Sequence, residues 1–289
     1  MKRRHGRMIL YLVGFVALLG VGGTAALAAD DDAPGPQADL KAFQAHFKRQ
    51  FPNVAFDDFV NGPYAMDAGM RAQWQQIMQF PPFDFELSDG KKLFNTAFAN
   101  GHSYASCFPH GGIGIAQSYP YFDATTGKVM TLDGAIQACR VKNGEALLDW
   151  SKGPLAEIAA YMVSTSQGQR FDVKVPNDRQ AIAAYEAGKQ YFYSRRGQLN
   201  FSCASCHVQA AGKRLRGDIL APALGLLAAF PIYRDTWGDL GTADRRFQEC
   251  NLQVRAEPLP PDSEAYNDLE YFLSYMNNGL PVTGPGERP

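Results

Sequence analysis

The sequence has no large excess of charge of either sign, and it has few histidines and cysteines. Its 28 Lys and Arg residues nearly balance 29 Asp and Glu residues, and five histidines and five cysteines occur in 289 positions. A balanced charge disfavours a nucleic-acid partner. Hydrophobic residues at 46% and charged residues at 20% are typical of a globular protein rather than a disordered or membrane-embedded one. The length is sufficient for two domains.

The first 29 residues depart from this average. Four basic residues in the first seven positions precede an apolar run over 8–21, and Ala-Leu-Ala follows at 26–28. This order predicts a secretory signal peptide over 1–29; the alternative, an uncleaved membrane anchor, requires a longer apolar run. Cleavage leaves 24 basic and 29 acidic residues, a net charge of −5. Because such a signal directs export and is then removed, we expect a periplasmic protein with no stable membrane insertion.

Beyond the signal peptide, the chain is predicted to be mainly α-helical. Residues 30–44 begin with acidic residues, Pro and Gly, and are expected to form a flexible leader. Alternating strand patterns are rare. Apolar residues recur at helical spacing in five later segments, near 65–79, 88–99, 154–165, 178–194 and 264–277.

Four short landmarks occur twice in the same order, which indicates a duplicated domain. The matched pairs are 89–94 with 187–192, 104–108 with 203–207, 136–139 with 247–250, and 159–162 with 273–276. The polar stretch from Ser164 to Arg179 is the expected boundary. The predicted domains are therefore 45–175 and 176–289.

The second copy contains a C-x-x-C-H motif at Cys203, Cys206 and His207. In c-type cytochromes two thiols at this spacing add to the vinyl groups of haem, and the histidine becomes an axial iron ligand. A redox dithiol or half of a zinc site are the alternatives. Neither a thioredoxin-like βαβ pattern nor a second C-x-x-C or H-x-x-x-H is present, so we predict one covalently bound haem c.

The first copy lacks this motif, because Tyr104 and Phe108 replace the first cysteine and the histidine. It is therefore predicted to be haem-free. The histidines at positions 46, 102 and 110 are interpreted as structural. Cys107 and Cys139 occupy corresponding places at the empty pocket and are expected to pair as a disulfide.

That pairing leaves Cys250 as the odd cysteine, next to the predicted haem pocket. A thiolate bound to iron is protected from oxidation, so we favour Cys250 over Met276 as the second axial ligand. A buried inert thiol and an intermolecular disulfide are the alternatives. Arg246 lies four residues earlier and would share a helical face with Cys250. Guanidinium groups here would lower the pKa of the Cys250 thiol and offer forked donors to an oxyanion. For Arg245 and Arg255, pairing with haem propionates or surface acids is an equally good interpretation.

These residues resemble the SoxA family, the haem-bearing subunits of SoxAX cytochromes. The resemblance rests on Phe-Val-Asn-Gly-Pro-Tyr at 59–64, Gly90 to Phe94, the haem motif, and Arg-Arg-Phe-Gln-Glu-Cys at 245–250 followed by Val254 to Pro258. It implies two tandem cytochrome-c-like domains. Some members of the family bind a second haem in the first domain, but Tyr104 and Phe108 depart from that pattern, so this chain resembles the single-haem forms. The resemblance also implies that Cys250 is the distal ligand and a catalytic persulfide, and that Arg246 contacts substrate.

The activity implied by the resemblance is that of an L-cysteine S-thiosulfotransferase. Thiosulfate is joined oxidatively to a cysteine of the carrier SoxYZ, and electrons leave through SoxX, the partner in a heterodimer. A plain electron-transfer cytochrome without substrate chemistry is the competing hypothesis. A third is a binding module in which haem is structural or sensory.

Overall fold

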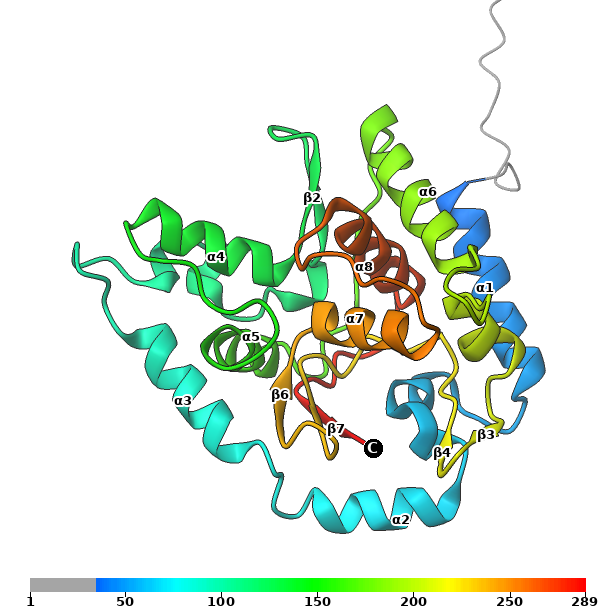
Figure 1. The fold of residues 1–289 in the computed structure, drawn as a ribbon. Helices are drawn as coiled ribbons and strands as arrows, with labels where there is room; N and C mark the ends of the chain where they lie inside the picture. The colour runs from blue at the N-terminus through cyan, green and yellow to red at the C-terminus, as the bar shows by residue number, and fades with distance from the viewer. Residues whose placement is uncertain (1–34) are drawn as a thin grey trace, which may run out of the picture. The chain divides into compact units, whose positions relative to one another are not determined.

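Helices make up most of the regular structure of residues 35–289, the part of the chain that the computed structural model describes (Figure 1). The signal peptide predicted over 1–29 lies outside this range. All five predicted helical segments are confirmed, as α2 (Ala68–Ile77), α3 (Asp84–Asn95), α5 (Pro154–Ser164), α6 (Arg179–Tyr193) and α8 (Glu264–Met276). No helix within the described range has the length and apolar composition needed to cross a bilayer.

Helix α1 (Pro36–Gln50) covers much of the segment predicted to be a flexible leader, so that prediction is wrong for residues 36–44. Phe43 and Phe47 are buried on one face of α1, and the Phe43 ring packs edge-on against Phe272 with centroids 6.3 Å apart. Burying each of these side chains contributes roughly 1.5–3 kcal/mol, which is enough to order a short amphipathic helix against the rest of the protein.

Two β-hairpins each lead into a short helix. β1 (Tyr121–Asp123) and β2 (Lys128–Met130) precede α4 (Leu132–Lys142), and β5 (Ile232–Arg234) and β6 (Asp239–Gly241) precede α7 (Ala243–Gln253). Strand β7 (Gly286–Arg288) lies parallel to β5 and completes a three-stranded sheet. The remaining elements used below are η1 (Phe56–Ala65), η5 (Ser205–Gln209), β3 (Arg214–Leu215) and β4 (Asp218–Ile219).

The two hairpin-and-helix units share details at matching positions. Thr131 caps α4 and Thr242 caps α7, and each hydroxyl accepts a hydrogen bond from a backbone amide in the first turn. Gln137 on α4 and Gln248 on α7 each donate to a backbone carbonyl in the loop that follows the helix, at 2.8 and 3.0 Å. Thr131 and Thr242 are separated along the chain by the same number of residues as Gln137 and Gln248. Cys139 and Cys250, which end the third predicted landmark, have this separation too.

Helices α3 and α5 cross at a glycine, and so do α6 and α8. A Cβ at Gly90 would lie 1.9 Å from the carbonyl oxygen of Glu157, and a Cβ at Gly188 would lie 1.9 Å from that of Asp268. Any side chain larger than that of glycine would force these helices apart. The two contacts make Glu157 the structural counterpart of Asp268.

This register corrects the fourth predicted landmark. Met162 lies five residues after Glu157, so its counterpart is Leu273, which lies five residues after Asp268. The predicted match of 159–162 with 273–276 is therefore wrong by three residues, nearly one helical turn. A Tyr-Met dipeptide occurs in both α5 and α8 and led to the wrong sequence alignment of these helices. The contacts at Gly90 and Gly188 give the alignment instead.

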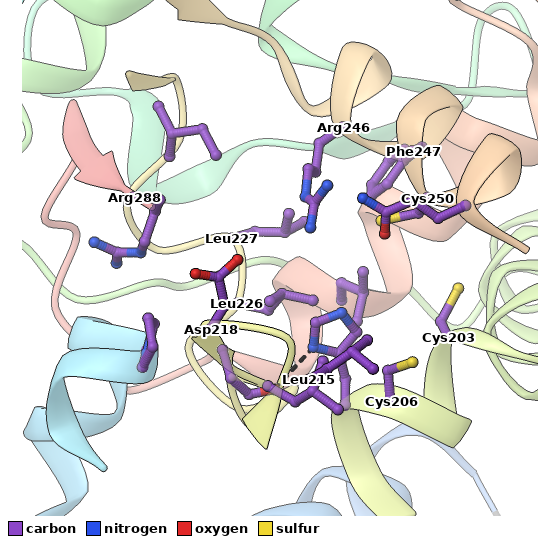
Figure 2. Close-up of a pocket in the computed structure, with 18 of the residues that line it drawn as sticks. Cys203, Cys206, Leu215, Asp218, Leu226, Leu227, Arg246, Phe247, Cys250 and Arg288 are labelled. Atoms are coloured by element: carbon purple, nitrogen blue, oxygen red, sulfur yellow. Dashed lines mark hydrogen bonds between the residues drawn. The ribbon is translucent and has the colours of Figure 1, made fainter. Parts of the chain in front are cut away.

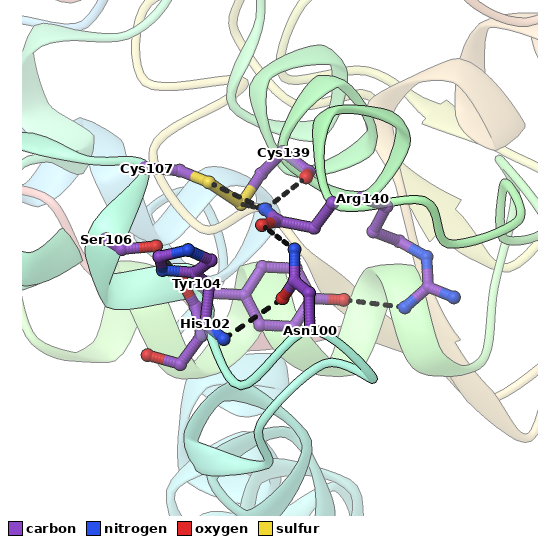
Figure 3. Close-up of a disulfide and its surroundings, with 9 residues drawn as sticks. Asn100, His102, Tyr104, Ser106, Cys107, Cys139 and Arg140 are labelled. Atoms are coloured by element: carbon purple, nitrogen blue, oxygen red, sulfur yellow. Dashed lines mark hydrogen bonds between the residues drawn. A yellow bond between two sulfur atoms is a disulfide. The ribbon is translucent and has the colours of Figure 1, made fainter.

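The predicted disulfide between Cys107 and Cys139 is confirmed (Figure 3). Next to it, Tyr104 is buried and stacks on Phe94 with ring centroids 5.9 Å apart. The Tyr104 hydroxyl accepts a hydrogen bond from Arg140 at 2.9 Å. The internal sequence match aligns Tyr104 with Cys203 of the motif, so an aromatic side chain with its own polar partner occupies the aligned position.

Replacing Cys107 with serine is expected to lower the free energy of unfolding by about 3 to 4 kcal/mol, because the cross-link no longer restricts an unfolded loop of 32 residues. Urea unfolding followed by circular dichroism measures the loss. Cys139→Ser should give the same loss and the double variant no further loss, since all three lack the same bond. Single variants as stable as the wild type would contradict this prediction.

A second feature of the fold is a cluster of carboxyl groups. Asp133 on α4 and Glu270 on α8 line a small cavity, and Asp244 and Asp262 lie close enough to repel both. None of the four forms an ion pair with a residue in 35–289. Burial, together with this repulsion, raises the pKa of Asp133 to about 8 and the pKa of Asp244 to about 6, and it raises the pKa of Glu270 as well.

Stability is therefore expected to fall as the pH rises from 5 to 8. The folded state holds the protons of these carboxyl groups more tightly than the unfolded chain does. Their contribution to stability is therefore complete below about pH 4 and is lost as the pH rises through the raised pKa values. Asp133→Asn should increase the free energy of unfolding at pH 8 by on the order of 2 kcal/mol and weaken the pH dependence. Urea titrations at both pH values test this, with the exposed Asp172→Asn as control. A variant that keeps the wild-type pH dependence would refute the assignment.

Candidate functional site

The three residues of the C-x-x-C-H motif line one cavity in the second half of the chain (Figure 2). Cys203 starts a helical turn that continues directly into η5, where Cys206 and His207 lie. The hydroxyl of Ser202 accepts a hydrogen bond from the amide of Ser205 at 3.1 Å and fixes the start of this turn. The motif therefore presents two thiols and an imidazole to the same space.

His207 is prepared to act as a metal ligand through one ring nitrogen. Burial lowers its pKa to about 4, so the imidazole is neutral at physiological pH. Nδ1 lies 2.8 Å from the carbonyl oxygen of Ala221, and because a carbonyl only accepts, Nδ1 carries the proton. Nε2 is thereby left with a free lone pair, the arrangement common to metal-binding histidines.

Cys250 reaches the same cavity from α7. The sulfur of Cys250 lies on the side of the cavity where Cys203 and Cys206 also point (Figure 2). Cys250 is a free cysteine, the only one outside both the disulfide and the haem motif. The fold thus brings together the predicted attachment residues and the predicted distal sulfur.

Arg246 lies one helical turn before Cys250 and also lines the cavity. Burial alone lowers the pKa of this guanidinium, but the nearby Cys250 and Glu249 outweigh burial and leave the pKa raised. Arg246 is therefore a permanent cation beside the sulfur. A partly buried guanidinium in this position attracts a thiolate and offers forked donors to an oxyanion.

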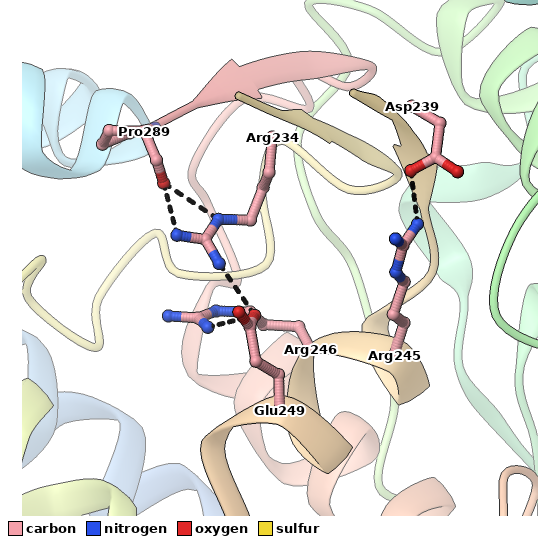
Figure 4. A network of polar contacts seen from close by, with 6 residues as sticks. All are labelled: Arg234, Asp239, Arg245, Arg246, Glu249 and Pro289. Carbon is pink, nitrogen blue, oxygen red and sulfur yellow. Dashed lines mark hydrogen bonds and ion pairs between the residues drawn. The ribbon is translucent and has the colours of Figure 1, made fainter. Parts of the chain in front are cut away.

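A carboxylate holds Arg246 in place (Figure 4). One oxygen of Glu249 accepts from Nη1 of Arg246 at 2.6 Å and from Nη1 of Arg234 at 2.7 Å. Arg234 is buried and also donates to the carbonyl oxygen of Pro289 through Nε, at 2.9 Å. Glu249 thus ties helix α7 to strand β5 while the other nitrogens of Arg246 remain available.

Of the three arginines predicted near Cys250, only Arg246 lines the cavity. Arg245 instead donates to Asp239 at 2.5 Å and lies over the ring of Trp237. Arg255 follows α7 and is not part of the cavity wall. Met276 is fully buried and does not line the cavity either.

The rest of the wall is largely apolar, and it contains polar residues that no motif predicted. The apolar part comes from several elements, including Leu215, Ile219, Leu226, Leu227, Phe230, Phe247, Leu269 and Leu273. Arg196, Arg234 and Arg288 are cations of this wall, and Asp218 is an acid of the wall. An apolar cavity with two thiols and a neutral imidazole fits a covalently bound haem.

Three comparisons describe what the chain is similar to. A family model described as SoxA/TsdA, cytochrome c domain, matches residues 89–171. The L-cysteine S-thiosulfotransferase subunit SoxA of Allochromatium vinosum is 46% identical over 286 residues, 99% of each chain. The SoxA subunit of Chlorobaculum tepidum is 49% identical over 251 residues, 87% of each chain. A crystal structure titled SoxXA from P. pantotrophus matches with a TM-score of 0.66 and 30% identity, covering 72% of this chain and 79% of that one.

Proposed function

The chain belongs to the SoxA family, and from this premise we propose that it is the haem-bearing catalytic subunit of a SoxAX cytochrome. As a SoxA protein it is a c-type cytochrome and an L-cysteine S-thiosulfotransferase subunit. The observation that carries the proposed chemistry is one cavity that contains the haem motif on one segment and Cys250 with Arg246 on another.

In our proposal the chain consists of two tandem cytochrome-c-like domains, 45–175 and 176–289, and only the second binds haem. The matching hairpins, caps and glycine crossings support the duplication. The family model for a cytochrome c domain falls on 89–171, within the haem-free copy. Tyr104 and the disulfide at Cys107 account for the absence of haem there, because they remove both attaching thiols.

Cys203 and Cys206 would attach one haem c, and His207 would bind its iron through Nε2. Cys250 would be a second iron ligand, and its sulfur would also be the reactive group. When bound, the haem supplies a one-electron acceptor close to this sulfur. The wall around the Cys250 sulfur is largely apolar, and this low polarity strengthens the electrostatic effect of Arg246.

The proposed reaction joins thiosulfate to a cysteine thiolate of the carrier SoxYZ. A sulfur–sulfur bond forms, two electrons are released, and the product is a cysteine S-thiosulfonate. One haem accepts one electron, so a second acceptor is needed, and the partner cytochrome SoxX would provide it. Cys250, carried as a persulfide, would present a reactive outer sulfur, and Arg246 would neutralise the sulfonate oxygens of thiosulfate.

The test is turnover by the purified haem-loaded complex with thiosulfate, the carrier and a cytochrome acceptor. Mass spectrometry of the carrier should reveal one added thiosulfonate group per modified cysteine, and acceptor reduction should require both thiosulfate and carrier. A complex with full haem and reversible redox behaviour that leaves the carrier unmodified would instead be a plain electron-transfer cytochrome. Cell fractionation tests the proposed periplasmic location of the mature chain.

A further inference from the structure

Arg288, on strand β7, is a cation of the cavity wall that has no carboxylate partner among residues 35–289. Its guanidinium donates to the backbone carbonyls of Val60 and Glu287, each at 2.7 Å. Within residues 35–289 it forms no ion pair at 4.0 Å or less. Burial lowers its pKa, which reflects the cost of keeping this charge away from water.

The acids near Arg288 are engaged elsewhere or exposed. Glu287 is buried, and its carboxylate accepts a hydrogen bond from the hydroxyl of Tyr64 at 2.7 Å. Asp218 belongs to the same cavity wall but is exposed on β4. Arg234 and Arg246, by contrast, share Glu249. In the described part of the chain, Arg288 therefore differs from these two cavity arginines in having no carboxylate within ion-pair distance.

The Phe-Val-Asn-Gly-Pro-Tyr stretch of η1 forms the cradle of this guanidinium. Val60 supplies one of its two carbonyl acceptors, and the ring of Tyr64 lies under it with the guanidinium carbon 5.6 Å from the centroid. Gly62 has a left-handed φ of 57°, and a Cβ there would lie 3.4 Å from Nε of Arg288. A motif without an assigned role thus places a cation at the edge of the cavity.

Arg288 lies where the propionate carboxylates of a bound haem are expected. The vinyl groups that react with cysteines and the two propionate carboxylates occupy different edges of the porphyrin. Arg288 lies across the cavity from Cys203 and Cys206, the proposed attachment residues (Figure 2). A carboxylate arriving at that edge would meet a partly buried guanidinium without an ion-pair partner in residues 35–289. Such charge-assisted pairs are among the strong hydrogen bonds of proteins.

We propose that Arg288 binds a propionate carboxylate of the haem, and that η1 and β7 together form the propionate end of the haem site. This inference rests on the proposed haem assignment at Cys203, Cys206 and His207. It adds a cofactor-binding residue from the C-terminal strand, far from the attachment motif in sequence.

Arg288→Met, made in the full haem-loaded protein with its partner cytochrome, tests the proposal. Loss of a positive charge beside the propionate should favour ferric over ferrous haem by about tenfold, a decrease of about 59 mV in midpoint potential. The propionate bending band in the resonance Raman spectrum should shift as well. Arg170→Met is the matched control, because Arg170 is an exposed residue that pairs with Asp57 and does not line the cavity. It should change neither readout.

Arg288→Gln keeps a donor for the Val60 carbonyl and replaces the methionine variant if that one does not fold; the same shifts are expected. Unchanged potential and Raman band in a loaded Arg288 variant would overturn the proposal. If those readouts stay constant while the KM for thiosulfate rises, the anion at Arg288 is the substrate and the proposal is likewise overturned. Thiosulfate turnover by the wild-type complex is measured in parallel, so failure of the proposed function is recognised separately.

Discussion

Cys250→Ala is expected to abolish thiosulfate-dependent turnover, by at least about a thousandfold, while the haem stays covalently attached. Cys203 and Cys206, the proposed attaching thiols, lie on a different segment from α7, so removing the sulfur of Cys250 should leave the attachment chemistry intact. The lost group is the proposed nucleophile itself, and neighbouring residues cannot replace it. Steady-state reduction of a cytochrome acceptor with thiosulfate and carrier measures the loss, and haem absorbance in denaturant measures attachment.

Two further measurements compare the wild type with the variant. In the wild type, the peptide containing Cys250 should carry about +32 Da, the mass of one persulfide sulfur. In Cys250→Ala, the low-spin ferric thiolate signal in electron paramagnetic resonance should be absent. Cys107→Ser serves as control, since it removes a cysteine that forms a disulfide and does not line the cavity, and it should retain turnover. Turnover of Cys250→Ala within tenfold of the wild type would exclude Cys250 as the reacting sulfur.

The parts of the site that were predictable from sequence are those with short, chemically constrained spacing. The C-x-x-C-H motif specifies its own geometry, and one helical turn fixes the relation between Arg246 and Cys250. The Cys107–Cys139 disulfide was predictable because the internal sequence similarity aligns both cysteines with positions at the predicted haem pocket. In each case the information lies within one element or in an internal comparison.

Features that depend on distant segments meeting in space were not predictable. Arg288 belongs to the cavity only because β7 pairs with β5 and approaches η1, and no local pattern reports that meeting. The role of Arg245 was equally hidden, since its partners Asp239 and Trp237 lie on the preceding hairpin. The helix over 36–50 was obscured because its acidic, Pro- and Gly-containing approach resembles a linker, although its buried face is aromatic.

Arg246→Ala should lower kcat/KM for thiosulfate by roughly 100- to 1000-fold, the range found when one preorganised donor to a developing or bound oxyanion is removed. Arg246→Lys should fall between this variant and the wild type, because an ammonium keeps the charge but loses the planar fork that matches sulfonate oxygens. Arg245→Ala is the matched control: the same change at the adjacent position removes a guanidinium directed at Asp239 and Trp237. Its kcat/KM should stay within about threefold of the wild type.

The geometry around Glu249 makes this comparison informative. In Arg246→Ala the carboxylate of Glu249 keeps its ion pair with Arg234, so the variant does not leave that acid unpaired. A loss of turnover therefore reports the missing contact to substrate rather than a collapsed network, and the unfolding midpoint in urea should change little. Equal losses in Arg246→Ala and Arg245→Ala would mean that the general positive charge of α7, and not the cation in the cavity, attracts thiosulfate. Unequal losses at equal stability assign substrate binding to Arg246.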